Sequence, residues 1–144
     1  MSDTRIEICQ CVSSEPIAIE LCLRGWNELT AKGLGDGRLV FHSNMSAIVG
    51  YAANGRDQEA VGVILFGLEP EFKRCWLTLS YVREEYRARG VYAAMYEALR
   101  GETRRMGLRT IESATHVRNV AMRAVAKRQG RLEEFVILID RIEG

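Results

Sequence analysis

The sequence predicts an α/β protein in which a mixed β-sheet carries helices on both faces. Two observations support this fold class. Three strand-like segments follow one another in the first half of the chain, and strands then alternate with two amphipathic helical segments up to the last residues. The first arrangement is typical of an antiparallel meander and the second of β-α-β-α-β connections, which together give a mixed sheet.

The first two elements are a short strand and a long helix. Residues 5–11 alternate apolar and polar side chains, which predicts a strand. The S-E-P sequence at residues 14–16 is a helix start with proline in the first turn, and apolar residues at helical spacing continue to residue 31. Gly25 weakens this helix and is a candidate point at which it divides in two. Glycines then mark a loop at residues 33–37.

The sheet continues with strands at residues 46–53, 60–69 and 74–82. The N-G-R-D sequence between the first two contains an Asn-Gly pair that suits a tight hairpin. Pro70 interrupts the connection between the second and third. These three segments therefore predict an antiparallel run.

The second half alternates helices and strands. A helix is predicted at residues 90–106, a short strand at 109–115 and a second helix at 119–129, followed by a glycine at the C-terminal position that glycine favours. Residues 132–140 are rich in Val, Ile and Phe and predict a final strand.

Composition indicates one ordinary globular domain over residues 1–144, with 47% hydrophobic and 27% charged residues. The longest apolar run, residues 60–68, is far shorter than the roughly 20 residues of a membrane span. The N-terminal sequence M-S-D-T-R-I-E-I lacks the apolar core of a signal peptide. The four cysteines show no C-x-x-C spacing, and only two histidines are present, so no metal site is expected. We therefore expect a cytoplasmic protein with reduced cysteines that makes no membrane contact.

Charge is distributed unevenly although the net charge is only +1. Residues 81–131 carry 12 basic and 5 acidic side chains, a net charge of +7, whereas the segments before and after it are each net −3. A local positive field of this kind suits an anionic ligand, and a pair of solvated basic helices gives the same count.

The segment from Leu77 to Tyr96 carries the strongest chemical signal. A strand ends at Val82, a charged loop follows, and a helix begins at Gly90. This order directs backbone N–H groups and a helix dipole toward one spot, and Arg87 and Arg89 add positive charge, so we predict an anion site. The sequence is neither a Walker loop nor a dinucleotide-binding G-x-G-x-x-G.

This segment resembles motif A of the GNAT superfamily of N-acetyltransferases, [Q/R]-x-x-G-x-[G/A] after a strand, with Arg87 and Gly90 at the matching positions. Asn119, followed by an amphipathic helix that ends at Gly130, is similar to the second signature of the family, and the element order agrees over nearly the whole chain. The resemblance implies a mainly antiparallel sheet with a splayed parallel strand pair at residues 74–82 and 109–115. It also implies acetyl-CoA as cosubstrate and an amine as acceptor.

The resemblance assigns roles to particular residues. The backbone of residues 80–82 would hold the pantetheine arm, and the N–H groups of residues 87–93 would hold the pyrophosphate. Asn119 would form a hydrogen bond near the pantetheine or the thioester end, and the N–H of Val82 would polarise the carbonyl oxygen. The implied cofactor residues are Ser80, Tyr81, Val82, Arg87, Ala88, Arg89, Gly90, Val91, Tyr92, Ala93 and Asn119.

The chain departs from the family pattern at three positions. Tyr92 replaces a small residue, so its side chain must turn away from the pyrophosphate or shape the acceptor channel. Ala126 replaces the tyrosine that often protonates the leaving thiolate, and Arg131 replaces a frequent phenylalanine. The general base is also absent from its commonest position in the family. Trp76 occupies the strand position where some relatives carry a glutamate or histidine, and Thr78 is the next inward candidate.

A primary ammonium must lose a proton before it attacks, so something must accept that proton. The candidates are Glu28, Glu112, His116 and ordered water. We name His116 because it follows a strand end near the expected cofactor fork and because imidazole is suited to the task. The alternatives are an exposed loop histidine, a solvent-facing Glu112 and a Glu28 on a helix surface.

Other side chains have two interpretations each. The aromatic residues line an acceptor pocket or belong to the core: Trp26, Phe41, Trp76 and Tyr81. Three arginines near the end of the predicted helix either bind the 3′-phosphate of CoA or form a solvated helix end: Arg104, Arg105 and Arg109. Ser43, Ser46 and Ser80 have no His and acid partner signature, which gives no support for a serine hydrolase.

We therefore predict a single-domain N-acetyltransferase that transfers acetyl from acetyl-CoA to a primary amine by direct attack in a ternary complex. The alternatives are an acyltransferase that acts on a protein or a modified nucleic-acid amine, and a CoA-binding module without turnover. Nucleic acid is the less favoured partner because the net charge is near neutral. The family makes a homodimer through sheet edges or the C-terminal strand plausible. The choice of acceptor depends on residues 15–40 and on the loops at 67–74 and 115–119.

Overall fold

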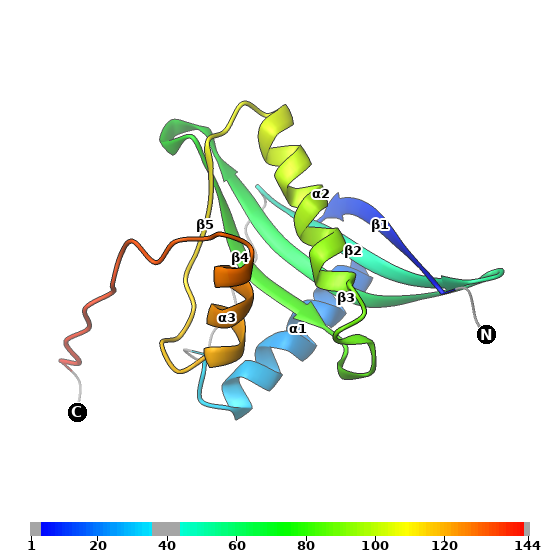
Figure 1. The fold of residues 1–144 in the computed structure, drawn as a ribbon, viewed down its shortest axis with the longest axis horizontal. Coiled ribbons are helices and arrows are strands. Elements are labelled where there is room, and N and C mark those ends of the chain that lie inside the picture. The colour runs from blue at the N-terminus through cyan, green and yellow to red at the C-terminus, as the bar shows by residue number, and fades with distance from the viewer. Residues whose placement is uncertain (1–3, 36–43, 143–144) are drawn as a thin grey trace. The chain divides into compact units, whose positions relative to one another are not determined.

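The computed structural model describes residues 4–35 and 44–142, which form two compact units, residues 1–114 and 115–144. The first unit holds a five-stranded sheet and two helices (Figure 1). Its elements are β1 (Arg5–Val12), α1 (Pro16–Ala31), β2 (Met45–Asn54), β3 (Asp57–Glu69), β4 (Arg74–Val82), α2 (Val91–Arg105) and β5 (Thr110–Ser113), with 3-10 turns at Pro70–Phe72 and Glu84–Tyr86. Phe41 and Ser43 lie outside the described residues.

The strands lie in the order β1-β2-β3-β4-β5, so each strand pairs with its neighbour in the sequence. The first four pair antiparallel, and β4 pairs with β5 in parallel. The predicted mixed, mainly antiparallel sheet is confirmed. A tight hairpin joins β2 to β3 at Gly55, whose φ of 63° suits glycine in such a turn.

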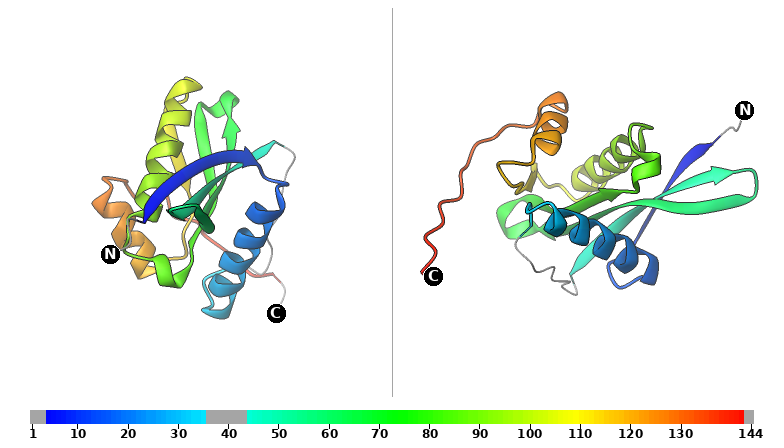
Figure 2. Two further views of the ribbon diagram at one scale, coloured as in Figure 1. Left: turned by 90° about the vertical axis from the view of Figure 1, so that its right-hand side faces the viewer. Right: turned by 90° about the horizontal axis from the view of Figure 1, so that it is seen from below.

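Each face of the sheet has its own core and its own helix (Figure 2). On one face α2 contributes Val91, Met95 and Leu99, which pack on Ile64 and Phe66 of β3. On the other face α1 packs through three buried residues, Ala18, Leu21 and Cys22, against alternate residues of β2, β3 and β4. The alternation along β3 therefore supplies both cores, since successive side chains of a strand point to opposite faces.

Gly25, the candidate point of division in the sequence, does not divide α1, which is continuous from Pro16 to Ala31. The glycine instead allows a close approach between α1 and β4. A Cβ at this position would lie 2.6 Å from Cβ of Tyr81 and 2.9 Å from its Cγ. Gly25 therefore sets how near α1 lies to the end of β4.

A β-bulge interrupts β4 in the middle of its pairing with β3. Leu65 pairs with Leu79 and Phe66 pairs with Leu77, so Thr78 is an extra residue without a partner in the register. Leu77 packs on the α2 side of the sheet, whereas Leu79 packs on the α1 side. The extra residue thus reverses the facing of the second half of β4.

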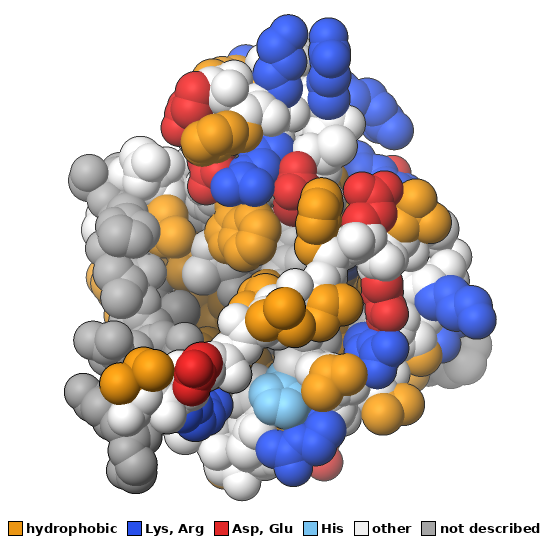
Figure 3. Space-filling view, turned by 90° about the vertical axis from the view of Figure 1, so that its left-hand side faces the viewer, with side chains coloured by type: hydrophobic (Ala, Val, Ile, Leu, Met, Phe, Trp, Pro, Cys, Tyr) orange, Lys and Arg blue, Asp and Glu red, His pale blue; other side chains and the backbone are white. Residues whose placement is uncertain are grey.

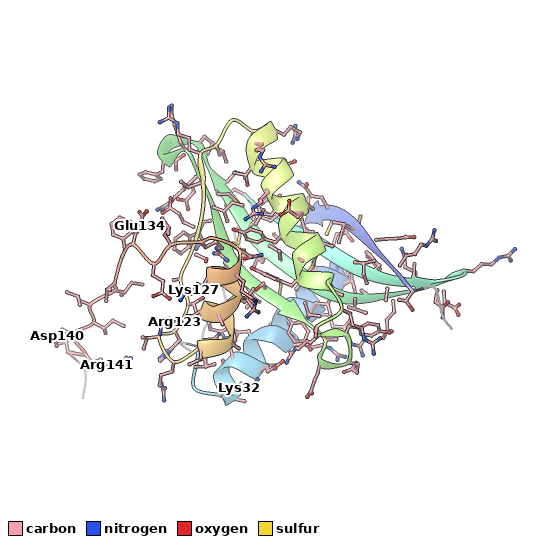
Figure 4. All side chains as sticks on the ribbon, in the orientation of Figure 1. Lys32, Arg123, Lys127, Glu134, Asp140 and Arg141 are labelled. Carbon is pink, nitrogen blue, oxygen red and sulfur yellow. The ribbon has the colours of Figure 1, made fainter. Side chains whose placement is uncertain are left out.

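The second unit contains one helix and an extended segment. Helix α3 spans Val120–Arg128, and Arg123 and Lys127 are labelled on it in Figure 4. The strand predicted at residues 132–140 is wrong for this structure, because the described residues after Arg131 are extended but join no ladder. The physical reason is that β-propensity reflects packing against neighbouring strands more than an intrinsic backbone preference.

The extended segment leaves its apolar side chains exposed. Seven of the thirteen large apolar side chains that are exposed among the described residues belong to residues 132–142, and Figure 3 shows apolar groups at the surface. Leu138 is 90% exposed and Phe135 87%. In the part of the chain that the structure describes, no helix combines the length and apolarity needed to span a bilayer.

Candidate functional site

The site begins where β4 and β5 stop pairing. Their parallel ladder covers only Arg74–Leu77 of β4, opposite Thr110–Ser113 of β5, while β4 continues to Val82. Beyond Leu77, the side of β4 that faces away from β3 has no strand beside it among the described residues. This open edge starts at the Thr78 bulge and is able to take an extended ligand as a strand would.

The register shows which backbone groups point to the open edge. The N–H of Arg83 donates to the Val61 carbonyl at 2.8 Å, so the neighbouring Gly62–Val82 pair is of the non-hydrogen-bonded type. The N–H and C=O of Val82 therefore point away from β3. Two residues earlier, Ser80 points the same way. Tyr81 lies between them and directs its backbone toward Val63 of β3.

The loop from Arg83 to Gly90, which we call the anion loop, has a backbone geometry that suits anion binding. Two of its residues adopt left-handed backbone conformations, Ala88 at φ 61° and Gly90 at φ 84°. Alternating right- and left-handed residues turn successive N–H groups toward one concavity. Gly90 caps α2 without a side-chain hydrogen bond, so the first N–H groups of the helix face the same region.

The side chain of Arg87 is already engaged. Its Nε donates to the Val82 carbonyl oxygen at 2.8 Å, and its Nη2 donates to Oε2 of Glu28 at 2.7 Å. The guanidinium also lies 5.8 Å from the ring centroid of Tyr81. Arg87 thus joins α1, the end of β4 and the anion loop.

Arg89 is the loop cation that has no carboxylate partner among the described residues. Its guanidinium lies 5.4 Å from the ring centroid of Tyr86. Arg83, at the start of the loop, pairs with Glu59 at 2.7 Å. An anion in this loop therefore meets the N–H groups, the helix dipole and the charge of Arg89.

The other basic candidates lie at the far end of α2. The helix has 15 residues, so Arg104 and Arg105 lie about 20 Å along its axis from Gly90 at 1.5 Å per residue. Arg105 pairs with Glu102 at 2.6 Å. Tyr92, near the helix start, is half-buried and lies against Tyr96, with ring centroids 5.8 Å apart.

Two carboxylates considered as proton acceptors are held by cations. Glu28 accepts from Arg87 and also from Lys32 at 3.0 Å, and the Arg87 hydrogen bond lowers the pKa of the Glu28 carboxyl below its usual value. A lowered pKa makes a carboxylate a weaker base. Glu112 on β5 accepts from Arg74 at 3.3 Å and from the Thr110 hydroxyl at 2.7 Å.

His116 and Asn119 belong to the second unit. His116 is exposed, and its Nδ1 accepts a hydrogen bond from the Arg118 backbone N–H at 3.1 Å. A neutral imidazole has one acceptor nitrogen, so this bond must open before Nδ1 takes a proton. Asn119 is the N-cap of α3, where its Oδ1 accepts from the Met122 N–H at 3.2 Å.

Two residues that the sequence analysis considered for other roles, Trp26 and Thr78, each carry a buried polar atom. Nε1 of Trp26 on α1 and Oγ1 of Thr78 in the β4 bulge are buried without a hydrogen-bond partner among the described residues. The bulge that places Thr78 depends on pairing with β3, which no local pattern encodes. The indole of Trp26 packs with the core on the α1 side of the sheet.

The remaining features lie outside the open edge. A polar depression of about 240 Å³ opens near the tip of the β2–β3 hairpin. Its lining residues are Thr4, Ala52, Asn54, Asp57, Gln58, Glu59 and Tyr86. Glu59 in its wall is engaged by Arg83 and by the Tyr86 hydroxyl. Residues 4–35 and 44–142 contain no group of three His, Cys, Asp or Glu side chains able to hold a metal ion.

Comparison with known proteins decides the family. The family model described as Acetyltransferase (GNAT) family matches residues 24–130, which include β4, the anion loop, α2 and α3. The chain belongs to the GNAT family of acetyltransferases. A sequence comparison with curated proteins gives no match.

Solved GNAT structures share the fold at low sequence identity. A ribosomal-protein-alanine N-acetyltransferase from Brucella melitensis biovar Abortus 2308 is 13% identical, with 96% of this chain and 100% of that chain covered and a TM-score of 0.68. An aminoglycoside acetyltransferase from an uncultured soil metagenomic sample is 17% identical, with 96% and 99% covered and a TM-score of 0.70. The aminoglycoside N-acetyltransferase AAC(6')-Iy in complex with CoA is 18% identical, with 96% and 100% covered and a TM-score of 0.65.

Within this GNAT chain, the departures from the motif have structural counterparts. The ring of Tyr92 packs with Tyr96 in the core on the α2 side of the sheet. Ala126 lies at the end of α3, where its carbonyl accepts from the N–H of Arg131 at 3.0 Å. Position 126 thus carries no hydroxyl able to protonate a leaving thiolate.

Proposed function

We propose that this protein transfers an acetyl group from acetyl-CoA to a primary amine by direct attack in a ternary complex. The observation that carries the proposal is the open edge of β4 beside the anion loop, in a chain of the GNAT family. The two features suit the two halves of the cosubstrate. An amide-containing arm pairs with a strand edge, and a pyrophosphate pairs with clustered N–H groups.

The binding roles follow from the directions of these groups. Ser80 and Val82 offer backbone groups to the pantetheine arm, and Tyr81 supports them through its ring against α1. The N–H groups of residues 87–93 hold the pyrophosphate, and Arg89 adds its charge. Asn119 is assigned to the thioester end through the family motif. The family model crosses from the first unit into the second, which supports one catalytic domain over residues 1–144.

The chemistry requires carbonyl polarisation and removal of a proton. Bound acetyl-CoA supplies the thioester, whose carbonyl carbon gains a bond to nitrogen and loses its bond to sulfur as CoA thiolate leaves. The N–H of Val82 stabilises the negative charge that develops on the oxygen. His116 accepts the ammonium proton, with ordered water as the alternative. Because no tyrosine stands at Ala126, the thiolate takes its proton from solvent, and the nitrogen that has gained the acetyl group releases its second proton to solvent.

A covalent cysteine intermediate plays no part in the proposal. Cys22 and Cys75 are buried in the cores on either side of the sheet. Burial raises the pKa of the Cys22 thiol to about 12 and that of Cys75 to about 11, so neither is a thiolate near neutral pH. All four cysteines are free, which fits the proposed cytoplasmic location.

Thermal unfolding with acetyl-CoA, CoA and NAD tests the cofactor assignment. A ligand at 100 times its dissociation constant stabilises the folded state by about 2.7 kcal/mol. We expect a shift with acetyl-CoA and with CoA and none with NAD. Absence of a shift with both CoA compounds would contradict the cofactor assignment, and absence of CoA release over an amine panel would contradict the enzyme assignment.

Replacement of Val82 by proline tests the oxyanion role. The Val82 N–H points away from β3, so Val82→Pro removes no ladder hydrogen bond, and it is expected to lower kcat about 100-fold. Val82→Ala keeps the N–H and serves as the matched control. Equal kcat values in the two variants would overturn the role of this N–H.

Two alternatives concern the acceptor and turnover. The solved relatives act, by name, on aminoglycosides and on a ribosomal protein, so a small amine and a protein amine are both tested. Transfer to protein or nucleic acid predicts turnover only with a macromolecular acceptor, and salt-sensitive turnover in the nucleic-acid case. The absence of a tyrosine at Ala126 favours the non-catalytic alternative. In that case the protein binds CoA, and no amine causes release of CoA from acetyl-CoA.

We also propose that the chain forms a homodimer through residues 132–142. The five central residues, F-V-I-L-I, are apolar on both strand faces, which is typical of a strand with neighbours on both sides. An antiparallel pair of these segments, centred on Ile137, places Phe135 opposite Ile139, Val136 opposite Leu138, and Glu133 opposite Arg141. The segment is thus complementary to itself in both apolar and charged positions.

Crosslinking through one added cysteine tests this register in a background with Cys9→Ser and Cys11→Ser, in which the remaining native cysteines, Cys22 and Cys75, are buried. Ile137 meets itself across the two-fold axis, so Ile137→Cys is expected to give a disulfide-linked dimer. Ile142→Cys, which is also highly exposed, is the control and is expected to crosslink weakly. A monomer in sedimentation, or equal crosslinking of the two variants, would exclude the proposed interface.

A further inference from the structure

Glu28 and Arg87 form an ion pair that bridges two elements with different tasks in the proposed reaction. Glu28 lies on α1, and Arg87 lies in the anion loop, 59 residues later. The Nη2–Oε2 distance is 2.7 Å, and the side chains of Arg87 and Glu28 are only 40% and 31% exposed. The pair is therefore partly shielded from solvent, which strengthens it relative to a fully exposed pair.

The same guanidinium holds the end of β4. Nε of Arg87 donates to the Val82 carbonyl, and the ring of Tyr81 lies beneath the guanidinium. The next peptide N–H, that of Arg83, donates to Val61 of β3. The peptide between Val82 and Arg83 is thus fixed on both sides, and the planar fork of arginine suits two acceptors in different directions.

The helix that carries Glu28 is itself fixed against β4. Gly25, one turn before Glu28, contacts Tyr81 so closely that a Cβ would clash. Glu28 is further held by Lys32 on the following turn at 3.0 Å. The carboxylate therefore presents a fixed acceptor to Arg87 and not a mobile side chain.

We propose that Glu28 is a positioning residue for the cofactor site, which acts through Arg87 to hold the start of the anion loop against the end of β4. This inference rests on the proposed function, because it concerns how the chain presents its N–H groups to the pyrophosphate of CoA. The side chain of Arg87 has a structural role, because it contacts Glu28 and the end of β4. Its backbone and the residues after it bind the anion. Glu28 touches neither the cosubstrate nor the reacting atoms.

The change in CoA affinity caused by Glu28→Gln has one sign if Glu28 is a positioning residue and the opposite sign if only its charge matters. Loss of a negative charge near an anion site raises the local positive potential, so Coulomb's law alone predicts tighter CoA binding in Glu28→Gln. A freed Arg87 that turns to the phosphates gives the same sign. The positioning role predicts weaker binding, because the loop loses its fixed attachment and must be ordered when the ligand binds.

The test is isothermal titration of CoA into wild type, Glu28→Gln and Glu20→Gln. Glu20 also lies on α1 and pairs with Arg24 at 3.3 Å, so its variant removes the same charge from the same helix without touching the loop. We expect Glu28→Gln to weaken CoA binding about threefold to tenfold and Glu20→Gln to leave it unchanged. In turnover, the KM for acetyl-CoA is expected to rise while kcat stays constant.

A double-mutant cycle shows whether Glu28 acts through Arg87. In an Arg87→Met background, Glu28→Gln is expected to have no further effect on CoA affinity. Tighter or unchanged binding in Glu28→Gln, or an equal loss in the Arg87→Met background, would overturn the inference. If wild type itself does not bind CoA, the proposed function fails, and this outcome is distinct from each of those.

Discussion

The contact between Gly25 and Tyr81 gives a sharp prediction for stability. Gly25→Ala adds a methyl group 2.6 Å from Cβ and 2.9 Å from Cγ of Tyr81. Ordinary van der Waals contact begins at 3.4 Å, and both partners are atoms fixed close to a backbone. No side-chain rotation relieves the overlap, so α1 must withdraw from β4.

Two opposing terms set the magnitude. Alanine is favoured over glycine inside a helix by about 1 kcal/mol. Overpacking of a well-packed site costs about 1–3 kcal/mol. We therefore expect Gly25→Ala to lower the free energy of unfolding by up to about 2 kcal/mol, or about 6 °C in Tm at about 3 °C per kcal/mol for a chain of this size.

Gly101→Ala is the matched control, because Gly101 lies within α2 and a Cβ there meets nothing within 4 Å. It keeps the propensity gain without the clash and is expected to raise the free energy of unfolding by about 1 kcal/mol. Chemical denaturation of both variants measures the difference. Equal stabilisation by the two substitutions would refute the close approach of α1 to β4.

Three further predictions concern single groups. Gly90→Ala is expected to cost about 1 kcal/mol in urea unfolding, because φ at this position is 84° while a Cβ would meet nothing; an unchanged midpoint would contradict the left-handed conformation. The lowered pKa of Glu28 means that its stabilisation is present above the usual value of 4.5 and is lost as the pH falls through the lower folded value. The difference in stability between wild type and Glu28→Gln is therefore expected to be constant from neutral pH to about pH 5 and to vanish in stronger acid. A thiol reagent at pH 8 is expected to modify exposed Cys9 well before buried Cys22 or Cys75, and simultaneous labelling of all three in mass spectra would contradict their burial.

Local patterns predicted most of the elements of the first unit. The alternation at residues 5–11, the Asn-Gly turn at 54–55 and the apolar stripe of residues 90–106 each correspond to an observed strand, hairpin or helix. These signals are local because a strand or helix shows its buried face in its own periodicity. The mixed sheet followed from their order.

The same local patterns do not predict which strands pair with each other or in which register. The segment at residues 132–140 has strand composition, yet a strand exists only where another strand is beside it. Likewise, the residues around Thr78 do not indicate a bulge, because the extra residue is defined by the register between β3 and β4.

The candidate site was predictable in part. Arg87 and Gly90 were expected in an anion loop from their spacing before a helix, and the structure describes them in such a loop. The partner of Arg87 was not expected, because Glu28 precedes it by 59 residues and was considered only as a proton acceptor. Contacts at this separation arise from the packing of α1 on the sheet.

The Thr78 bulge also has a consequence for how this chain tolerates insertions and deletions. Removal of one residue between Leu77 and Leu79 would restore an uninterrupted ladder with β3, which a count of hydrogen bonds alone would favour. After this deletion Leu79 would still pair with Leu65 and Leu77 with Phe66, so Tyr81 would stay on the α1 side of the sheet and Val82 on the α2 side. β4 can therefore lose its residue at position 78 and keep the facing of its side chains, whereas a deletion between Leu79 and Val82 would move the residues after it to the opposite face.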